Sequence, residues 1–171
     1  MNKTTAILLS LSALPSAAWA FDSAAWEARK ATVDAEAERL KAAYAHYVLK
    51  VDAPSFDLRI PLEQYANGSV KTMIHAKRAQ FFTSDNVIWG KEITLTQFDD
   101  HGKKSLELNA ENALIDRPSG ACWVNGRVQI IHGGTMLEGV NAYYSSTSDY
   151  FKIISNARIA STDISLKGLK L

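Results

Sequence analysis

The feature that most constrains the fold of this chain is a repeat in which a glycine precedes an alanine by eight residues. It occurs three times, as Gly68 and Ala76, Gly102 and Ala110, and Gly134 and Ala142. A second small residue follows three positions later, as Ala79, Ala113 and Ser145. The glycines are 34 and 32 residues apart, which indicates one repeated supersecondary unit. Glycine supplies the positive φ of a tight hairpin turn. We therefore predict a stack of hairpins that share one apolar interior.

Strand signals fill residues 55–171, where clusters of turn-forming residues separate short runs of alternating polarity. These clusters are Asn67-Gly68, Ser84-Asp85-Asn86, Asp99 to Gly102, Arg117 to Gly120, Asn125-Gly126, His132 to Gly134, Ser145 to Asp149 and Ser155-Asn156. Short strands at this spacing favour a mainly β fold, as a sandwich, jelly roll or barrel. Pro61 suits the first of these strands only if that strand lies at a sheet edge.

Residues 1–20 have the pattern of a cleavable signal peptide. Lys3 provides the charged start, residues 6–14 form an apolar core, and Ala18-Trp19-Ala20 provides the small residues of a cleavage site. The apolar core is shorter than the roughly 20 residues that span a bilayer. We expect a mature chain that begins at Phe21 and is exported, and an uncleaved membrane anchor is the alternative.

Residues 21–51 are predicted to form one amphipathic helix ahead of the β-domain, which we assign to residues 55–171. Apolar residues recur at three- and four-residue steps, at Trp26, Val33, Ala37, Leu40, Tyr44 and Tyr47. Asp22 or Ser23 can cap the helix, and Pro54 stops it. Two interpretations remain open. The helix caps one open end of the β-domain, or it docks on a partner or a membrane protein.

The chemistry of the sequence indicates a protein that is not an enzyme. The net charge of +1 gives no electrostatic case for binding nucleic acid. The densest polar cluster, Asp99-Asp100-His101, precedes a turn glycine, and His46, His75 and His132 lack metal-ligand spacing. No nucleophile motif or phosphate loop is present. We therefore expect no catalytic residues, no metal and no cofactor, and we expect Cys122 to be a buried apolar residue.

The apolar residues of the strands, assigned to one face by their alternation, form the candidate lipid-groove residues. They are Ile93, Leu95, Leu106, Leu108, Ile115, Val128, Ile130, Leu137, Tyr144, Phe151, Ile153 and Ile159. A closed sandwich core and an interior partly open to a lipid need the same residues, so composition leaves both alternatives open.

Residues 113–159 carry a resemblance to a known family. The motifs are Ala113-Leu114-Ile115-Asp116, Ser119-Gly120, Asn125-Gly126-Arg127-Val128-Gln129-Ile130, Gly134, Leu137, Tyr144 and Ser155-Asn156-Ala157-Arg158-Ile159. Residues 68–112 follow the pattern more loosely. The chain resembles the periplasmic lipopolysaccharide-transport proteins of the OstA-like kind, the bridge components A and C.

The resemblance implies an OstA-like β-jellyroll, a V-shaped double antiparallel sheet whose apolar groove holds acyl chains. It implies a non-enzymatic lipid carrier in the periplasm that joins other β-jellyroll transport components by pairing of edge strands. Association with the inner membrane is a further expectation. The implied ligand is lipopolysaccharide or a related lipid. Two alternatives are an exported envelope-assembly scaffold with a closed sandwich and a partner-docking helix, and a carbohydrate-binding sandwich that uses Trp89 or Trp123.

Overall fold

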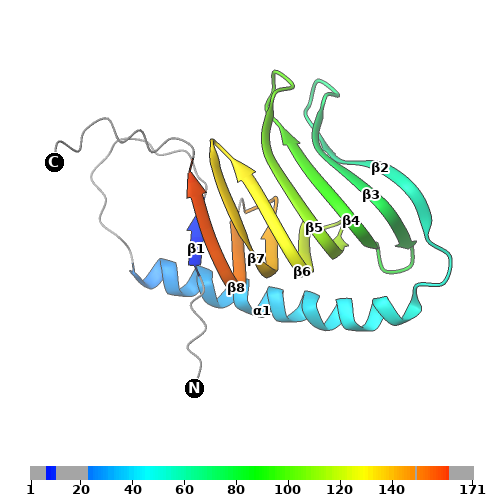
Figure 1. Ribbon diagram of the computed structural model, residues 1–171, viewed down its shortest axis with the longest axis horizontal. Helices are drawn as coiled ribbons and strands as arrows, with labels where there is room; N and C mark the ends of the chain where they lie inside the picture. Colours follow the sequence, from blue (N-terminus) through cyan, green and yellow to red (C-terminus); the bar gives the residue numbers. More distant parts are fainter. Residues whose placement is uncertain (1–6, 11–22, 149, 162–171) are drawn as a thin grey trace.

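The computed structural model describes residues 7–10, 23–148 and 150–161. One helix, α1 (Ser23–Tyr47), is followed by a 3-10 turn, η1 (Val48–Lys50), and then by the strands of a single sheet (Figure 1). The strands are β1 (Ile7–Ser10), β2 (Ser55–Gln64), β3 (Val70–Phe82), β4 (Val87–Phe98), β5 (Lys104–Asp116), β6 (Ala121–His132), β7 (Thr135–Ser145) and β8 (Tyr150–Ser161). Apart from residues 7–10, the predicted signal peptide lies outside the described residues.

Strands β2 to β8 form a continuous antiparallel meander, and β1 pairs with the far edge of β8. The order β1-β8-β7-β6-β5-β4-β3-β2 places β2 at the opposite edge, where Pro61 costs no sheet hydrogen bond on the open side. The prediction of a mainly β fold with an N-terminal helix is confirmed. The β-strands nevertheless belong to one open sheet, whereas the resemblance implied a double sheet.

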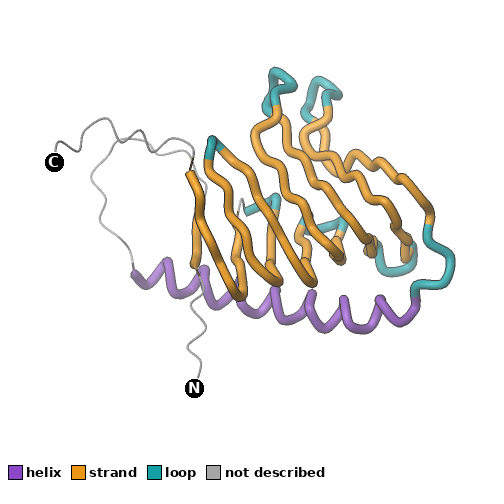
Figure 2. The backbone as a smooth tube through the Cα atoms, viewed as in Figure 1, coloured by secondary structure: helices purple, strands orange, loops and turns teal. Residues whose placement is uncertain are grey.

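A line of irregular residues crosses the sheet, and strands of the meander curve along their length (Figure 2). We call this line the crease. Residues with positive φ mark it on five strands, as Asp57, Glu92, Gly126, Asn141 and Asn156. The register shifts between β5, β6 and β7 fall on the same line. Such irregularities bend a strand, so the crease divides the sheet into two leaves.

The crease explains two predicted turns that are wrong. Asn125-Gly126 lies inside β6 and Ser155-Asn156 lies inside β8. Both pairs contain a residue with positive φ, Gly126 at 97° and Asn156 at 53°. Glycine and asparagine adopt this conformation more readily than other residues. The same residues therefore serve a bend within a strand or a turn between strands.

The small-residue repeat also lies at the crease. Ala76 and Ala79 both belong to the inner core, as do Ala110 and Ala113, although residues three apart face opposite sides of a flat strand. In the third unit the equivalent pair is Gly139 and Ala142, because Gly139 pairs with Val128 and Ala142 with Val124. The repeat in the sequence paired Ala142 with Ser145, three residues after it. In the structure the equivalent small residue is instead Gly139, three residues before Ala142.

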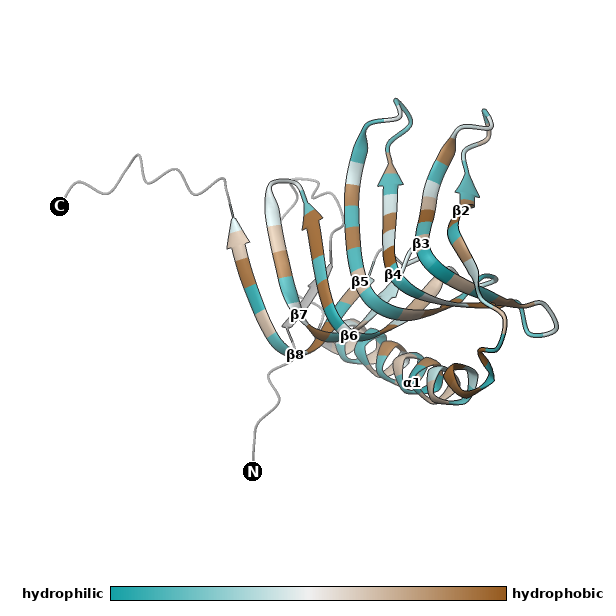
Figure 3. Cartoon of the chain, turned by 45° about the vertical axis from the view of Figure 1, so that its right-hand side comes forward, coloured by the Kyte–Doolittle hydropathy of each residue, from teal (hydrophilic) through white to brown (hydrophobic). Residues whose placement is uncertain are grey.

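The two leaves differ in what covers their outer faces (Figure 3). The helix-covered leaf, residues 78–91, 112–124, 142–148 and 150–154, packs on α1 through Trp123, Tyr143 and Tyr150. The free leaf comprises residues 58–76, 93–110, 127–140 and 157–161, and its outer face carries polar side chains. The helix stripe of Val33, Ala37 and Leu40 is buried against the sheet. The helix thus covers a sheet face, which differs from the predicted cap on an open end of the β-domain. Docking of α1 on a partner or a membrane protein stays a prediction.

Candidate functional site: an apolar interior between two leaves

The inner face of the free leaf carries an aliphatic row that crosses all seven strands of the meander. Strand pairing places its members side by side, as Ile60, Ile74, Leu95, Leu108, Ile130, Leu137 and Ile159. Because neighbouring strands lie about 4.8 Å apart, the row forms a continuous apolar band from one sheet edge to the other.

The helix-covered leaf presents a second apolar row to the same interior. Its members are Phe81, Ile88, Ile115, Cys122, Tyr144 and Phe151. Smaller residues lie between the two large rows and next to the crease, including Ala76, Ala79, Gly90, Ala113 and Gly139. Small side chains there let the leaves approach closely, and the larger ones fill the wider space toward the rims.

The structure brings the predicted groove residues together. Eleven of the twelve belong to one buried cluster: Ile93, Leu95, Leu106, Leu108, Ile115, Val128, Ile130, Leu137, Tyr144, Phe151 and Ile153. The twelfth, Ile159, lies at the edge and is 54% exposed. Leu114, which the family motif placed beside Ile115, instead packs on the helix side with Trp89.

The middle of the interior is filled by side chains. Ile74, Leu108 and Ile130 are at most 1% exposed. Burial raises the pKa of the Cys122 thiol in this cluster to about 12, which keeps the thiol protonated and unreactive near neutral pH. An acyl chain can occupy this space only if the leaves move apart.

The two ends of the interior are less covered than its middle. At the β2 end, Leu58, Ile60 and Leu62 are partly buried. At the other end, β1 pairs with β8 over Tyr150 to Ile153, and no described strand pairs with the remainder of that edge. The apolar row therefore reaches solvent where the sheet has unpaired edges, which are the usual sites of strand addition.

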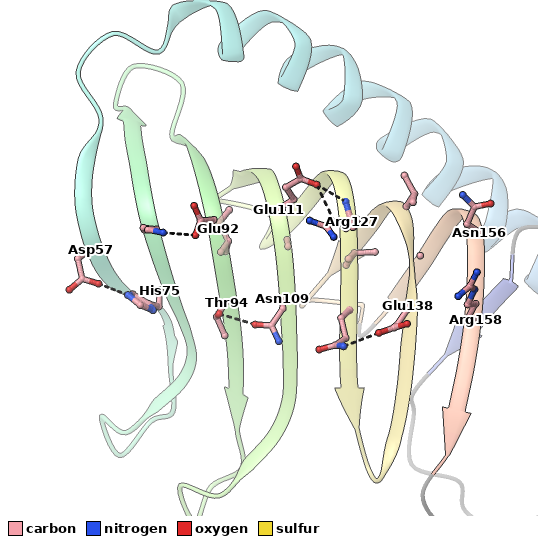
Figure 4. Close-up of a pocket in the computed structure, with 17 residues that line it drawn as sticks. Asp57, His75, Glu92, Thr94, Asn109, Glu111, Arg127, Glu138, Asn156 and Arg158 are labelled. Carbon is pink, nitrogen blue, oxygen red and sulfur yellow. Dashed lines mark hydrogen bonds and ion pairs between the residues drawn. The ribbon is translucent and has the colours of Figure 1, made fainter.

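The outer face of the free leaf forms an open polar hollow of about 1320 Å³ (Figure 4). Register partners cross it as a row, His75, Thr94, Asn109, Gln129, Glu138 and Arg158. Thr94 Oγ1 donates to Asn109 Oδ1 and Gln129 Nε2 donates to Glu138 Oε1, both at 2.9 Å. The hydrogen bond with His75 lowers the pKa of the Asp57 carboxyl. Many of the polar groups of this face are thus paired with one another.

The tryptophans considered as sugar platforms are buried. Trp89 is 8% exposed and Trp123 is 2% exposed, and both lie on the helix-covered side of the sheet. A sugar ring stacks on an accessible aromatic face, so neither residue can provide such a surface. The carbohydrate-binding interpretation therefore loses its proposed site.

The described residues give no metal-binding group of three or more His, Cys, Asp or Glu side chains. Asp99, from the predicted polar cluster, accepts hydrogen bonds from the backbone N–H groups of His101 and Lys103 and so stabilises its own turn. Within the described part of the chain, no helix is long and apolar enough to span a membrane.

Sequence reasoning missed the polar contacts at the rims of the leaves. Glu63, near the end of β2, bonds to Thr72 on the neighbouring strand and to Ser146 in the turn between β7 and β8. Glu63 and Ser146 are 83 residues apart. A single carboxylate near the end of an edge strand gives no periodic or motif signal for such a contact.

A scan of the sequence against protein-family models finds no matching family, and a search of curated proteins finds no match. The fold and the site define a class: a mainly β protein with one open antiparallel meander and an N-terminal helix packed on one of its leaves.

Proposed function

We propose that the protein is a non-enzymatic carrier of lipid acyl chains that holds them between the two leaves of its sheet. The observation that carries this proposal is the aliphatic row, which runs from edge to edge and exposes Ile159 at one end. An acyl chain gains about 0.8 kcal/mol per buried CH₂. A chain of about twelve methylenes therefore gains on the order of 10 kcal/mol, without any reaction chemistry.

The lipid is proposed to be lipopolysaccharide or a related periplasmic lipid. This step rests on the OstA-like motifs in residues 113–159 and on the predicted signal peptide. Inner-membrane association is a further expectation from the same resemblance.

Partners of the same β-jellyroll class are proposed to join at the sheet edges. The edge of β2 faces no other described strand, and β1 covers β8 only at Tyr150 to Ile153. Cleavage after Ala20, as the sequence predicts, would remove β1 and free the whole edge of β8. An added strand would then extend the sheet by β-augmentation and continue the apolar row into the partner.

Photo-crosslinking tests the lipid site. A photoreactive amino acid replaces Ile159 or Ile130 on the inner face, and matched variants carry it at the outward-facing neighbours Arg158 and Gln129. The variants are incubated with radiolabelled lipopolysaccharide or phospholipid. We expect labelled adducts from the inner positions and little labelling from their outer neighbours.

Equal labelling from both faces, or none from either, would contradict the carrier proposal. The filled middle of the interior, with Leu108 only 1% exposed, favours the rival scaffold function over a permanently open groove. Absence of adducts at Ile130 and Ile159, in variants that fold normally by circular dichroism, would support that rival.

A further inference from the structure

The rims of the two leaves meet at one carboxylate. Ser146 Oγ, on the rim of the helix-covered leaf, donates to Glu63 Oε1 at 2.7 Å, on the rim of the free leaf. The same hydroxyl lies 3.1 Å from the Gly120 carbonyl oxygen, so it bridges two turns and β2. Ser146 is 8% exposed. This contact closes the side of the interior that lies opposite the crease.

The second carboxylate oxygen of Glu63 is held on the free leaf. Thr72 Oγ1, which is fully buried, donates to Oε2 at 3.1 Å, and Lys71 Nζ lies 3.2 Å from the same oxygen. One oxygen thus bonds within its own leaf and the other reaches across to the opposite leaf. This division fixes the carboxylate on β2 while leaving the contact with Ser146 as the part that can open.

The turn that carries Ser146 is closely packed. The backbone N–H of Ser146 donates to the Gly120 carbonyl at 3.2 Å. A Cβ added to Gly120, whose φ is +64°, would lie 2.3 Å from Ser146 Oγ and 3.3 Å from Glu63 Oε1. Glycine at this position therefore permits the hydroxyl to approach the carboxylate.

We propose that Glu63 is a clasp that controls access of acyl chains to the interior, and this inference rests on the carrier function proposed above. With the Glu63–Ser146 bond made, the leaves are shut over the buried aliphatic row. With the bond broken, the rims part about the crease and a chain enters from the side. The crease provides the flexing line because its positive-φ residues interrupt the regular strand geometry.

The native thiol reports opening without any lipid. Cys122 is 2% exposed and lies on the inner face, so a thiol reagent reaches it when the leaves part or the chain unfolds. Glu63→Gln should raise its labelling rate about tenfold, because a neutral amide oxygen is a weaker acceptor for the Ser146 hydroxyl than the carboxylate is. The control Glu38→Gln weakens an exposed 3.2 Å contact with Lys41 on the surface of α1, away from the crease and the rims, and should leave the rate unchanged.

Global unfolding is separated from opening by urea denaturation of the same variants. If labelling of Glu63→Gln accelerates only as much as its unfolding equilibrium changes, the leaves do not open locally and the clasp is refuted. Acceleration beyond that change supports the clasp.

A covalent lock tests access of the lipid itself. Glu63→Cys and Ser146→Cys are combined in a Cys122→Ala background and joined by a short bis-maleimide linker, with the unlinked double variant as control. The probe is a dansyl-labelled undecanoic acid, followed by fluorescence enhancement. We expect linking to reduce probe binding at least about tenfold relative to the unlinked double variant. Both proteins lack the Glu63–Ser146 hydrogen bond, so its loss does not contribute to this difference.

The two proposals fail differently in this experiment. If the unlinked protein and the natural chain bind no probe, the carrier function fails. If they bind it and the linked protein binds equally well, the carrier function stands and the clasp is wrong.

Discussion

The closest packing at the crease is around Gly139. A Cβ at this position would lie 2.3 Å from Ile153 Cγ2 and 3.0 Å from the backbone oxygen of Ser155. The aliphatic side chain can shift only within a filled core, and the backbone oxygen shifts less readily. At the residue scale, the absence of a side chain at Gly139 therefore permits the close approach of β7 and β8.

We predict that Gly139→Ala lowers the free energy of unfolding by about 1–3 kcal/mol, the usual effect of overpacking a core. Chemical denaturation measures it. In a double-mutant cycle, Ile153→Ala should relieve part of the effect, because it removes the methyl group that the new Cβ meets. Strict additivity of the two changes would contradict the packing explanation.

Residue patterns predicted the inner face better than they predicted the crease. Alternation placed Leu106, Leu108, Val128 and Ile130 correctly on one side, because period-two burial holds on each side of the crease. It failed at Asn125-Gly126, where turn-type residues lie inside β6. The residue type indicates whether a positive φ is tolerated at a position. Tertiary packing decides whether the chain there forms a turn between two strands or a bend within one strand.

At the scale of the element, α1 is held by a narrow apolar stripe with polar contacts at its borders. Leu40 is fully buried between Trp123 and its neighbours. Arg39 contributes a 2.8 Å ion pair with Asp116 of β5, and Asp34 pairs with Lys152 of β8. The helix therefore contacts strands from both halves of the meander and behaves as part of the fold.

We predict that Leu40→Ala lowers the free energy of unfolding by about 2–5 kcal/mol, because it leaves a cavity between helix and sheet. The matched control is Leu49→Ala in the following turn, where the leucine is 86% exposed and the change should be within about 0.5 kcal/mol. Urea denaturation followed by circular dichroism compares them. Similar values for the two variants would show that α1 is not packed as described.

The periodicity of residues 22–50 predicted the helix and most of its buried positions, including Val33, Ala37 and Leu40. It did not predict which surface the helix covers. That surface is made by Trp123, Tyr143 and Tyr150, from three strands, and their large outward side chains could be matched to the helix only after the strands were paired.

At the scale of the whole molecule, the closed state depends on pH through Glu63. Burial raises the pKa of this carboxyl, but the hydrogen bond from Ser146 and the Lys71 ammonium outweigh it, so the pKa lies below its usual value. A carboxyl with a lowered folded-state pKa stabilises the fold above its unfolded pKa of about 4.3. That contribution is lost as the pH falls through the folded-state pKa.

We predict that Glu63→Gln lowers the free energy of unfolding by about 1 kcal/mol at pH 7, and that the difference shrinks below about pH 4. Urea denaturation at the two pH values measures it. The exposed Glu38, paired with Lys41 on the helix surface, provides the control, and Glu38→Gln should change stability little at either pH. A Glu63→Gln effect that persists undiminished in acid would contradict this role for the ionised carboxylate.

The uneven number of strands in the meander gives the molecule a polarity. Because each neighbour runs antiparallel to the last, β2 and β8 point in the same direction at opposite borders of the meander. Subunits that all have the same orientation, with β8 of one beside β2 of the next, would meet through parallel strands and form a row with two different ends. Two subunits that meet through identical borders would pair antiparallel and form a symmetric couple that has no overall direction. Strand parity alone therefore ties the way in which the borders pair to whether an assembly of this chain has a direction.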